Sequence, residues 1–119
     1  MARSATEAWV ANLVSQVPSL ARLLDQHVAQ NDELLPHVFL GEVTRIVEGA
    51  MASGPSRVRD VTRILSVMEQ GLGSGDPTVV ELISVSFLEN LDQQASSYQP
   101  LRSMMGPLVR NELKRYERR

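Results

Sequence analysis

Apolar side chains recur every three or four residues along most of this 119-residue chain. That spacing is close to the period of an α-helix, so it places the apolar positions on one face of each helix. Prolines, glycines and short polar runs interrupt the pattern, and no stretch shows the strict alternation that predicts a β-strand. The pattern predicts an all-α fold of five to six helices, with short connections that favour antiparallel neighbours and allow HEAT-like packing.

Capping signals and prolines place the helix boundaries in the first half of the chain. Ser4 and Glu7 fit a capping box, in which each side chain accepts a hydrogen bond from the backbone N–H of the other residue. Pro18 ends this first helix and opens the second. Asp32 and Glu33 are expected to close the second helix and to open the third, because a helix N-terminus favours acidic side chains by about 0.3–1 kcal/mol.

The second half of the chain contains the most apolar segment. After a turn at 53–54 and a glycine-rich loop at 71–75, the segment 77–91 carries apolar side chains nearly all round the helix. Neighbours must cover such a helix on several sides, so it is expected at the centre of the fold. A polar linker over 92–100 and a break at 106–107 flank a short helical turn, and a last helix follows.

Composition agrees with a single helical domain over residues 1–119. The hydrophobic fraction is 43% and the formal net charge is −2, which gives no overall field to attract nucleic acid or an anionic membrane. There is no cysteine, which excludes a disulfide scaffold, a thiol nucleophile and a zinc–thiolate site. The N-terminus does not resemble a signal peptide and no apolar run is long enough to span a membrane, so a cytoplasmic protein without a membrane partner is expected.

Both histidines lie in the region from His27 to Glu42, together with several carboxylates. His27, Asp32, Glu33 and His37 are residue types that bind zinc or another divalent ion, but their spacing fits no helix-based motif such as H-E-x-x-H. His27 falls on the apolar face of the second helix, where a histidine is usually a buried residue with a nearby hydrogen bond. We therefore predict a turn between capped helices here, with no metal and no cofactor. A ligand-binding or metal-binding bundle that uses this region is the alternative.

No set of residues shows a pattern typical of catalysis. The glutamates at 42 and 48 and at 81 and 89 are spaced like solvated acids on helices. The chain contains neither the G-x-S-x-G motif of a serine hydrolase nor the Gly-Lys-Ser/Thr of a phosphate-binding loop. These observations favour a non-enzymatic protein over an enzyme, and no catalytic residue is predicted.

Arginines gather on the fourth helix. Arg57, Arg59 and Arg63 form a cationic ridge with Asp60 between them. The simplest interpretation is a solvated face with internal ion pairs. The functional interpretation is a docking surface for an acidic partner, because the arginine fork binds carboxylates well. The C-terminal segment 110–119 is also basic, but aromatic residues are scarce and a basic helix end complements its own dipole, so nucleic-acid binding is not favoured.

Three segments carry a resemblance to a known group of proteins. These are "ELLPHVFLGEVTRIV", "SGDPTVVELISVSFLENL" and "MMGPLVRNELKRYE". Together they resemble a family of small bacterial all-helical domains of largely unknown function, some of which are associated with toxin–immunity loci. The resemblance rests on apolar positions and turns over most of the chain. It implies antiparallel helix pairs and carries over no catalytic residue.

These observations lead to one preferred function and two alternatives. The preferred function is a non-enzymatic protein-interaction module of the bacterial cytosol, of the immunity type that binds and occludes a cognate toxin. The candidate partner-binding residues are Glu42, Arg45, Arg59 and Arg63, whose charges would steer and orient the partner. The first alternative is the small enzyme or ligand-binding bundle at residues 27–42. The second is a regulatory homodimer that uses an apolar side of the fifth or the sixth predicted helix.

Overall fold

In the computed structural model, which describes residues 4–117 apart from the side chains of residues 55 and 56, the predicted all-α fold is confirmed. The last two residues of the predicted basic C-terminus, 118 and 119, lie outside the described residues. The elements, in chain order, are α1 (Ala5–Gln16), the 3-10 turn η1 (Pro18–Leu20), α2 (Ala21–Asn31), α3 (Pro36–Ser53), α4 (Pro55–Leu72), α5 (Pro77–Ile83), the π-helical segment η2 (Ser84–Leu88), α6 (Tyr98–Ser103) and α7 (Pro107–Leu113).

Most of the predicted helix boundaries are confirmed. Ser4 and Glu7 make both hydrogen bonds of the capping box at the start of α1. Gly54 lies between α3 and α4 at a φ of 111°, a conformation that favours glycine. The carboxylate of Asp76 accepts hydrogen bonds from the backbone N–H groups of Thr78 and Val79 and so caps α5.

The boundary between α2 and α3 differs from the prediction. Asp32 adopts the left-handed conformation and ends α2, with a φ of 62°. The N-cap of α3 is Leu35, no side chain caps this helix, and its first turn contains no acidic residue. The expectation that Asp32 and Glu33 open α3 is therefore wrong, because a loop extends the chain for several residues before Pro36 starts the helix.

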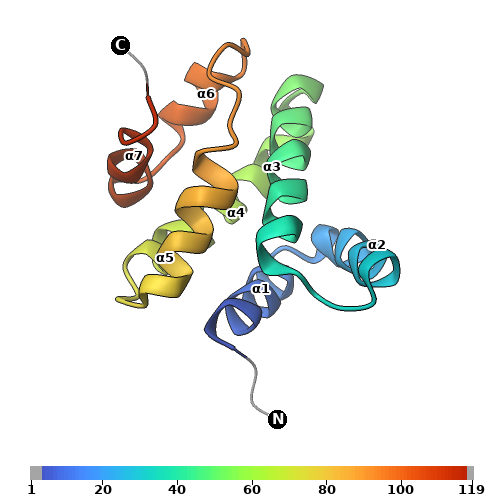
Figure 1. Cartoon of the computed structure of the whole chain (residues 1–119). Helices are drawn as coiled ribbons and strands as arrows, with labels where there is room; N and C mark the ends of the chain where they lie inside the picture. Colours follow the sequence, from blue (N-terminus) through green and yellow to red (C-terminus); the bar gives the residue numbers. More distant parts are fainter. Residues whose placement is uncertain (1–3, 118–119) are drawn as a thin grey trace.

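The predicted central segment is confirmed, although its geometry is not that of a single α-helix. Figure 1 shows α5 and η2 as one continuous rod, and this rod contacts α1, α3, α4 and α7. Leu82, Ile83, Phe87 and Leu88 are fully buried along it. The helix widens to the π form at η2, where the N–H of Glu89 donates to the carbonyl of Ser84, five residues earlier. The helical segment ends at Leu88 rather than at residue 91.

Two further expectations need correction. The apolar spacing of the third helix predicts that Ile46 is buried together with Val43 and Val47, but 44% of it is exposed, because it lies at the edge of the α3 face that packs on the core. The polar linker is shorter than 92–100, since α6 already begins at Tyr98, whose ring is buried. The α6–α7 region packs beside the rod, on the side away from α2 (Figure 1).

Candidate functional site

His27 joins α2, the following loop and α3. It is 1% exposed, and its Nε2 accepts a hydrogen bond of 3.0 Å from the backbone N–H of Leu35. Its Nδ1 lies 3.1 Å from Oε1 of Glu42. Since Nε2 accepts, the ring is neutral and Nδ1 donates to the carboxylate. The expectation of a buried, hydrogen-bonded histidine is confirmed, and both ring nitrogens are engaged within the chain, which leaves no lone pair for a metal.

An apolar groove lies between the η1–α2 segment and the hairpin of α3 and α4. Its volume is about 140 Å³. Each of the three walls contributes two apolar side chains to its floor: Leu20 and Leu23, Val47 and Ala50, and Val61 and Ile64. The exposed Ile46 stands at its edge, and Arg57, Asp60 and Ser19 complete the lining. The groove therefore combines an apolar floor with charged groups beside it.

The predicted partner-binding residues fall into two groups. Glu42 accepts a hydrogen bond from His27, and Arg45 donates to Glu48 and, over 3.2 Å, to the backbone carbonyl of Asn90. Glu42 and Arg45 thus hold together neighbouring parts of the fold. Their role in partner binding stays a prediction, and any partner would have to compete with these contacts.

Arg59 and Arg63 form the other group. Both are exposed on α4, and the guanidinium group of neither makes a hydrogen bond or an ion pair with any side chain that the structure describes. Arg57 is also exposed and has no such partner, whereas Asp60 accepts a hydrogen bond of 2.9 Å from the hydroxyl of Ser19. The internal ion pairs expected within the ridge are therefore absent from the described residues.

His37 takes part in a contact that the sequence did not reveal. Its Nδ1 lies 2.6 Å from Oγ of the buried Ser86 in η2. The carbonyl of Ser86 accepts hydrogen bonds from Thr44 and Asn90, which satisfy a backbone group in the π segment. A serine beside a histidine has two of the three parts of a nucleophilic site, but no carboxylate among residues 4–117 contacts His37. The pair connects α3 to the central rod.

The other serine of η2 anchors the C-terminal helix. Ser84 donates a hydrogen bond of 2.6 Å to Oε2 of Glu112, so the hydroxyl of Tyr116, also 2.6 Å away, donates to Ser84. Arg115 pairs with the same carboxylate oxygen of Glu112. The two serines of η2 thus bind opposite neighbours, α3 and the end of α7. No local pattern in the sequence indicates these pairings.

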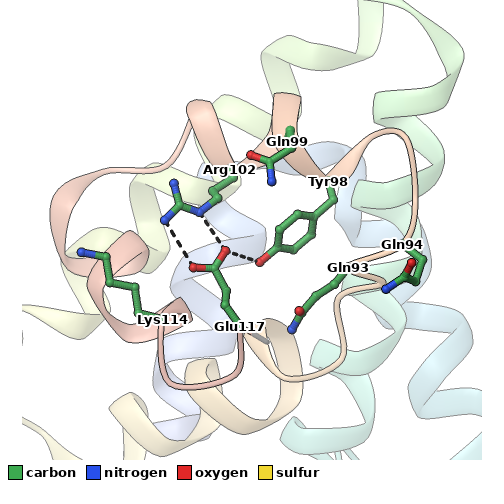
Figure 2. Close-up of a pocket in the computed structure, with 7 residues that line it drawn as sticks. All are labelled: Gln93, Gln94, Tyr98, Gln99, Arg102, Lys114 and Glu117. Carbon is green, nitrogen blue, oxygen red and sulfur yellow. Dashed lines mark hydrogen bonds and ion pairs between the residues drawn. The ribbon is translucent and has the colours of Figure 1, made fainter. Parts of the chain in front are cut away.

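A polar depression near the C-terminus contains a cluster of ionic and hydroxyl groups. Figure 2 shows Arg102 and Tyr98 converging on the carboxylate of Glu117, at 2.8 Å and 2.7 Å, with Lys114 to one side. The guanidinium of Arg102, and then the Tyr98 hydroxyl, hold the pKa of Glu117 below its usual range. Burial and the nearby carboxylate raise the pKa of Tyr98. Both oxygens of the carboxylate accept hydrogen bonds from these donors, so the cluster fastens residues after α7 to α6.

Ligands for a metal do not converge within the described part of the chain. Among residues 4–117, no group of three or more histidine, aspartate or glutamate side chains lies close enough to hold an ion. In the same residues, no helix is long and apolar enough to cross a membrane.

Comparison with known proteins identifies a family whose function is unknown. The model of a domain of unknown function, DUF7674, matches residues 10–119. No curated protein and no solved structure matches the chain.

Proposed function

This chain belongs to the DUF7674 family, whose function is unknown, and we propose that it is a non-enzymatic protein-interaction module. Its α4 arginines bind an acidic surface of another protein. The form that we propose is an immunity-type protein, which occludes the active surface of a cognate toxin. Three segments resemble a family of small bacterial all-helical domains, some of which are associated with toxin–immunity loci, and this resemblance supports the proposed form.

The observation that carries the proposal is the unfavourable placement of three unpaired cations on α4. Arg57 lies in the first turn of the helix, where the helix dipole favours acidic side chains. Arg59 and Arg63 are four residues apart, a spacing at which like charges destabilise a helix by about 0.2–0.5 kcal/mol. No described residue offsets these costs by pairing with the arginines. An arrangement that lowers the stability of the free protein is typical of a binding surface.

Charge reversal tests the proposal in a lysate of the source organism. The immobilised chain is expected to capture a partner that raised salt releases, because exposed charges are screened. Arg63→Glu is expected to lower capture by about tenfold, because it turns attraction into repulsion at the surface. Lys114→Glu is the matched control, since it makes the same charge change at an exposed position of the C-terminal region. Equal capture by wild type and Arg63→Glu would contradict the proposal.

The toxin-occluding form has its own test. The chain and the protein encoded beside it are co-expressed in a host that the neighbour alone inhibits. Growth is expected with the wild-type chain and with Lys114→Glu, but not with Arg63→Glu. If no variant protects the host while capture of another partner persists, the immunity-type form is wrong and the interaction module stands. Homodimer formation stays a prediction that light scattering tests.

A further inference from the structure

The groove beside the arginine ridge has the size of a receptor for one aliphatic side chain. Its volume of about 140 Å³ is close to the ~150 Å³ of an engineered apolar cavity that binds benzene. The six apolar floor residues come from three separate elements, so the walls are fixed by the core packing of η1–α2, α3 and α4. A site of this kind needs little rearrangement when an apolar group enters it.

Ile46 indicates that the groove opens toward a partner. It is 44% exposed, while the adjacent Val47 and the nearby Ala50 are buried in the core. Leu23, on the opposite wall, is only partly buried. Burial of apolar surface contributes about 25 cal/mol per Å², so an entering aliphatic group that covers both side chains stabilises the complex.

The charges near the groove select an acidic partner. Asp60 is engaged by Ser19, which leaves Arg57 as the lining charge without a partner among residues 4–117. Arg22, next to Leu23 on α2, and Arg63, one turn beyond Asp60 on α4, are also exposed and unpaired within the described chain. The charged lining therefore consists of Arg57 and of Asp60, which keeps its negative charge, and the unpaired guanidinium of Arg57 is the group that can bind a carboxylate. By contrast, the charged lining of the groove between α5 and α7 is Glu81 together with the ion pair of Glu112 and Arg115.

We propose that this groove receives a single aliphatic side chain from an acidic segment of the partner protein, with an adjacent carboxylate of that segment bound to Arg57. This inference rests on the proposed function and specifies how the partner is recognised. The groove alone is small beside the roughly 800 Å² that each side of a standard interface buries, so it supplies an anchor while the ridge supplies the surrounding contacts.

Benzene is the probe that tests the groove without the partner. In methyl NMR spectra, benzene is expected to shift the signals of Ile46, Val47, Val61 and Ile64 in the wild type. Ala50→Leu places a larger side chain in the groove and is expected to abolish these shifts. Ala52→Leu is the matched control, because residue 52 is an exposed alanine of the same helix. Shifts that persist in Ala50→Leu, or that are absent from the wild type, would overturn the proposal.

Two blocked dipeptides test the predicted carboxylate contact. Leucine–glutamate is expected to bind about twofold to fivefold more tightly than leucine–glutamine, the range of an exposed ion pair. Arg57→Gln is expected to remove that preference while the benzene shifts persist. Equal binding of the two dipeptides to the wild type would contradict the role of Arg57.

The captured partner separates failure of this inference from failure of the proposed function. Ile46→Glu, a change at an exposed position that the fold tolerates, is expected to weaken capture about tenfold, as is Ala50→Leu. If both variants capture the partner like the wild type while Arg63→Glu does not, the ridge binds the partner and the groove proposal is wrong. If Arg63→Glu has no effect, the proposed function itself fails, whatever benzene shows.

Discussion

Charged side chains have different roles in the C-terminal and the N-terminal parts of α4. Near the C-terminal end, the carboxylate of Glu69 accepts hydrogen bonds of 2.8 Å and 3.0 Å from the N–H groups of Leu108 and Val109. It thereby caps α7, a helix that lies far along the chain. In the N-terminal half, the side chains of Arg59 and Arg63 have no such partner among the described residues. The same helix thus carries a carboxylate that caps another helix and, in its other half, exposed arginines that have no partner in the described part of the chain.

The contrast separates side chains whose contacts stabilise the fold from exposed side chains that make no such contact. The backbone of α7 approaches Glu69 so closely that a Cβ on Gly106 would lie 2.6 Å from the carboxylate. Gly71, also on α4, leaves space where α1 and α5 meet the helix. Changes at this end should therefore lower stability, whereas changes at the arginine end should alter binding.

Substitution of Gly71 is expected to have the largest effect. A Cβ at this position would lie 2.6 Å from Cδ1 of Ile83 and 2.7 Å from Nε1 of Trp9, so Gly71→Ala forces the core to shift. Such overpacking costs about 1–3 kcal/mol of the free energy of unfolding, measurable by urea denaturation. Gly49→Ala is the control, since nothing lies within 4 Å of its Cβ and alanine favours a helix. Equal stability of the two variants would contradict the close approach at Gly71.

Removal of the Glu69 cap on α7 is expected to have the second-largest effect on stability. Glu69→Gln removes the negative charge that α7 attracts at its N-terminus, and a loss of about 0.5–2 kcal/mol in the free energy of unfolding is expected. Gly106→Ala should cause a similar loss, because the new methyl group displaces the same carboxylate. The double variant is expected to lose less than the sum of the two single losses, since both act on one contact. Strictly additive losses would argue against the shared cap.

Local signals in the sequence explain why much of the fold was predictable. The capping box at Ser4 and the turn at 53–54 act over a few residues, and each was placed correctly. The central position of 77–91 followed from its apolar residues. Its π segment was not predictable, because the carbonyl of Ser86 accepts hydrogen bonds not only from the nearby Asn90 but also from Thr44, a residue of another helix.

Long-range contacts also explain why the candidate site was only partly predictable. The charges of Glu42 and Arg45 resemble those of Arg59 and Arg63 in the sequence. Only the structure shows that Glu42 meets His27 and that Arg45 meets Glu48 and Asn90. The groove was not predicted, because it requires three elements to converge and because Ile46 was expected to be buried.

The cluster at Glu117 predicts a smaller, pH-dependent effect on stability. Since Arg102 and Tyr98 lower the pKa of Glu117 in the folded protein, the stabilisation is fully present above the usual glutamate pKa. It is lost as the pH falls through the lowered value. Glu117→Gln should therefore reduce stability at neutral pH by about 0.2–1 kcal/mol, the range for an ion pair that solvent still reaches, and should remove part of the acid dependence. A series of urea titrations at decreasing pH measures both, and an unchanged acid dependence would rule out this role of Glu117.

Substitution of Arg59 is expected to cause the smallest change in stability. It also separates an effect on stability from an effect on binding most clearly. Arg59→Glu replaces a repulsive pair with Arg63 by an attractive pair at the same four-residue spacing. The loss of the repulsion and the gain of the attraction should each raise the free energy of unfolding by about 0.2–0.5 kcal/mol. The same variant should lose partner capture, because it places a negative charge on the docking surface. Arg59→Gln should lie between the wild type and Arg59→Glu in both measurements. A loss of stability in Arg59→Glu would show that Arg59 supports the fold, and the contrast between the two ends of α4 would then fail.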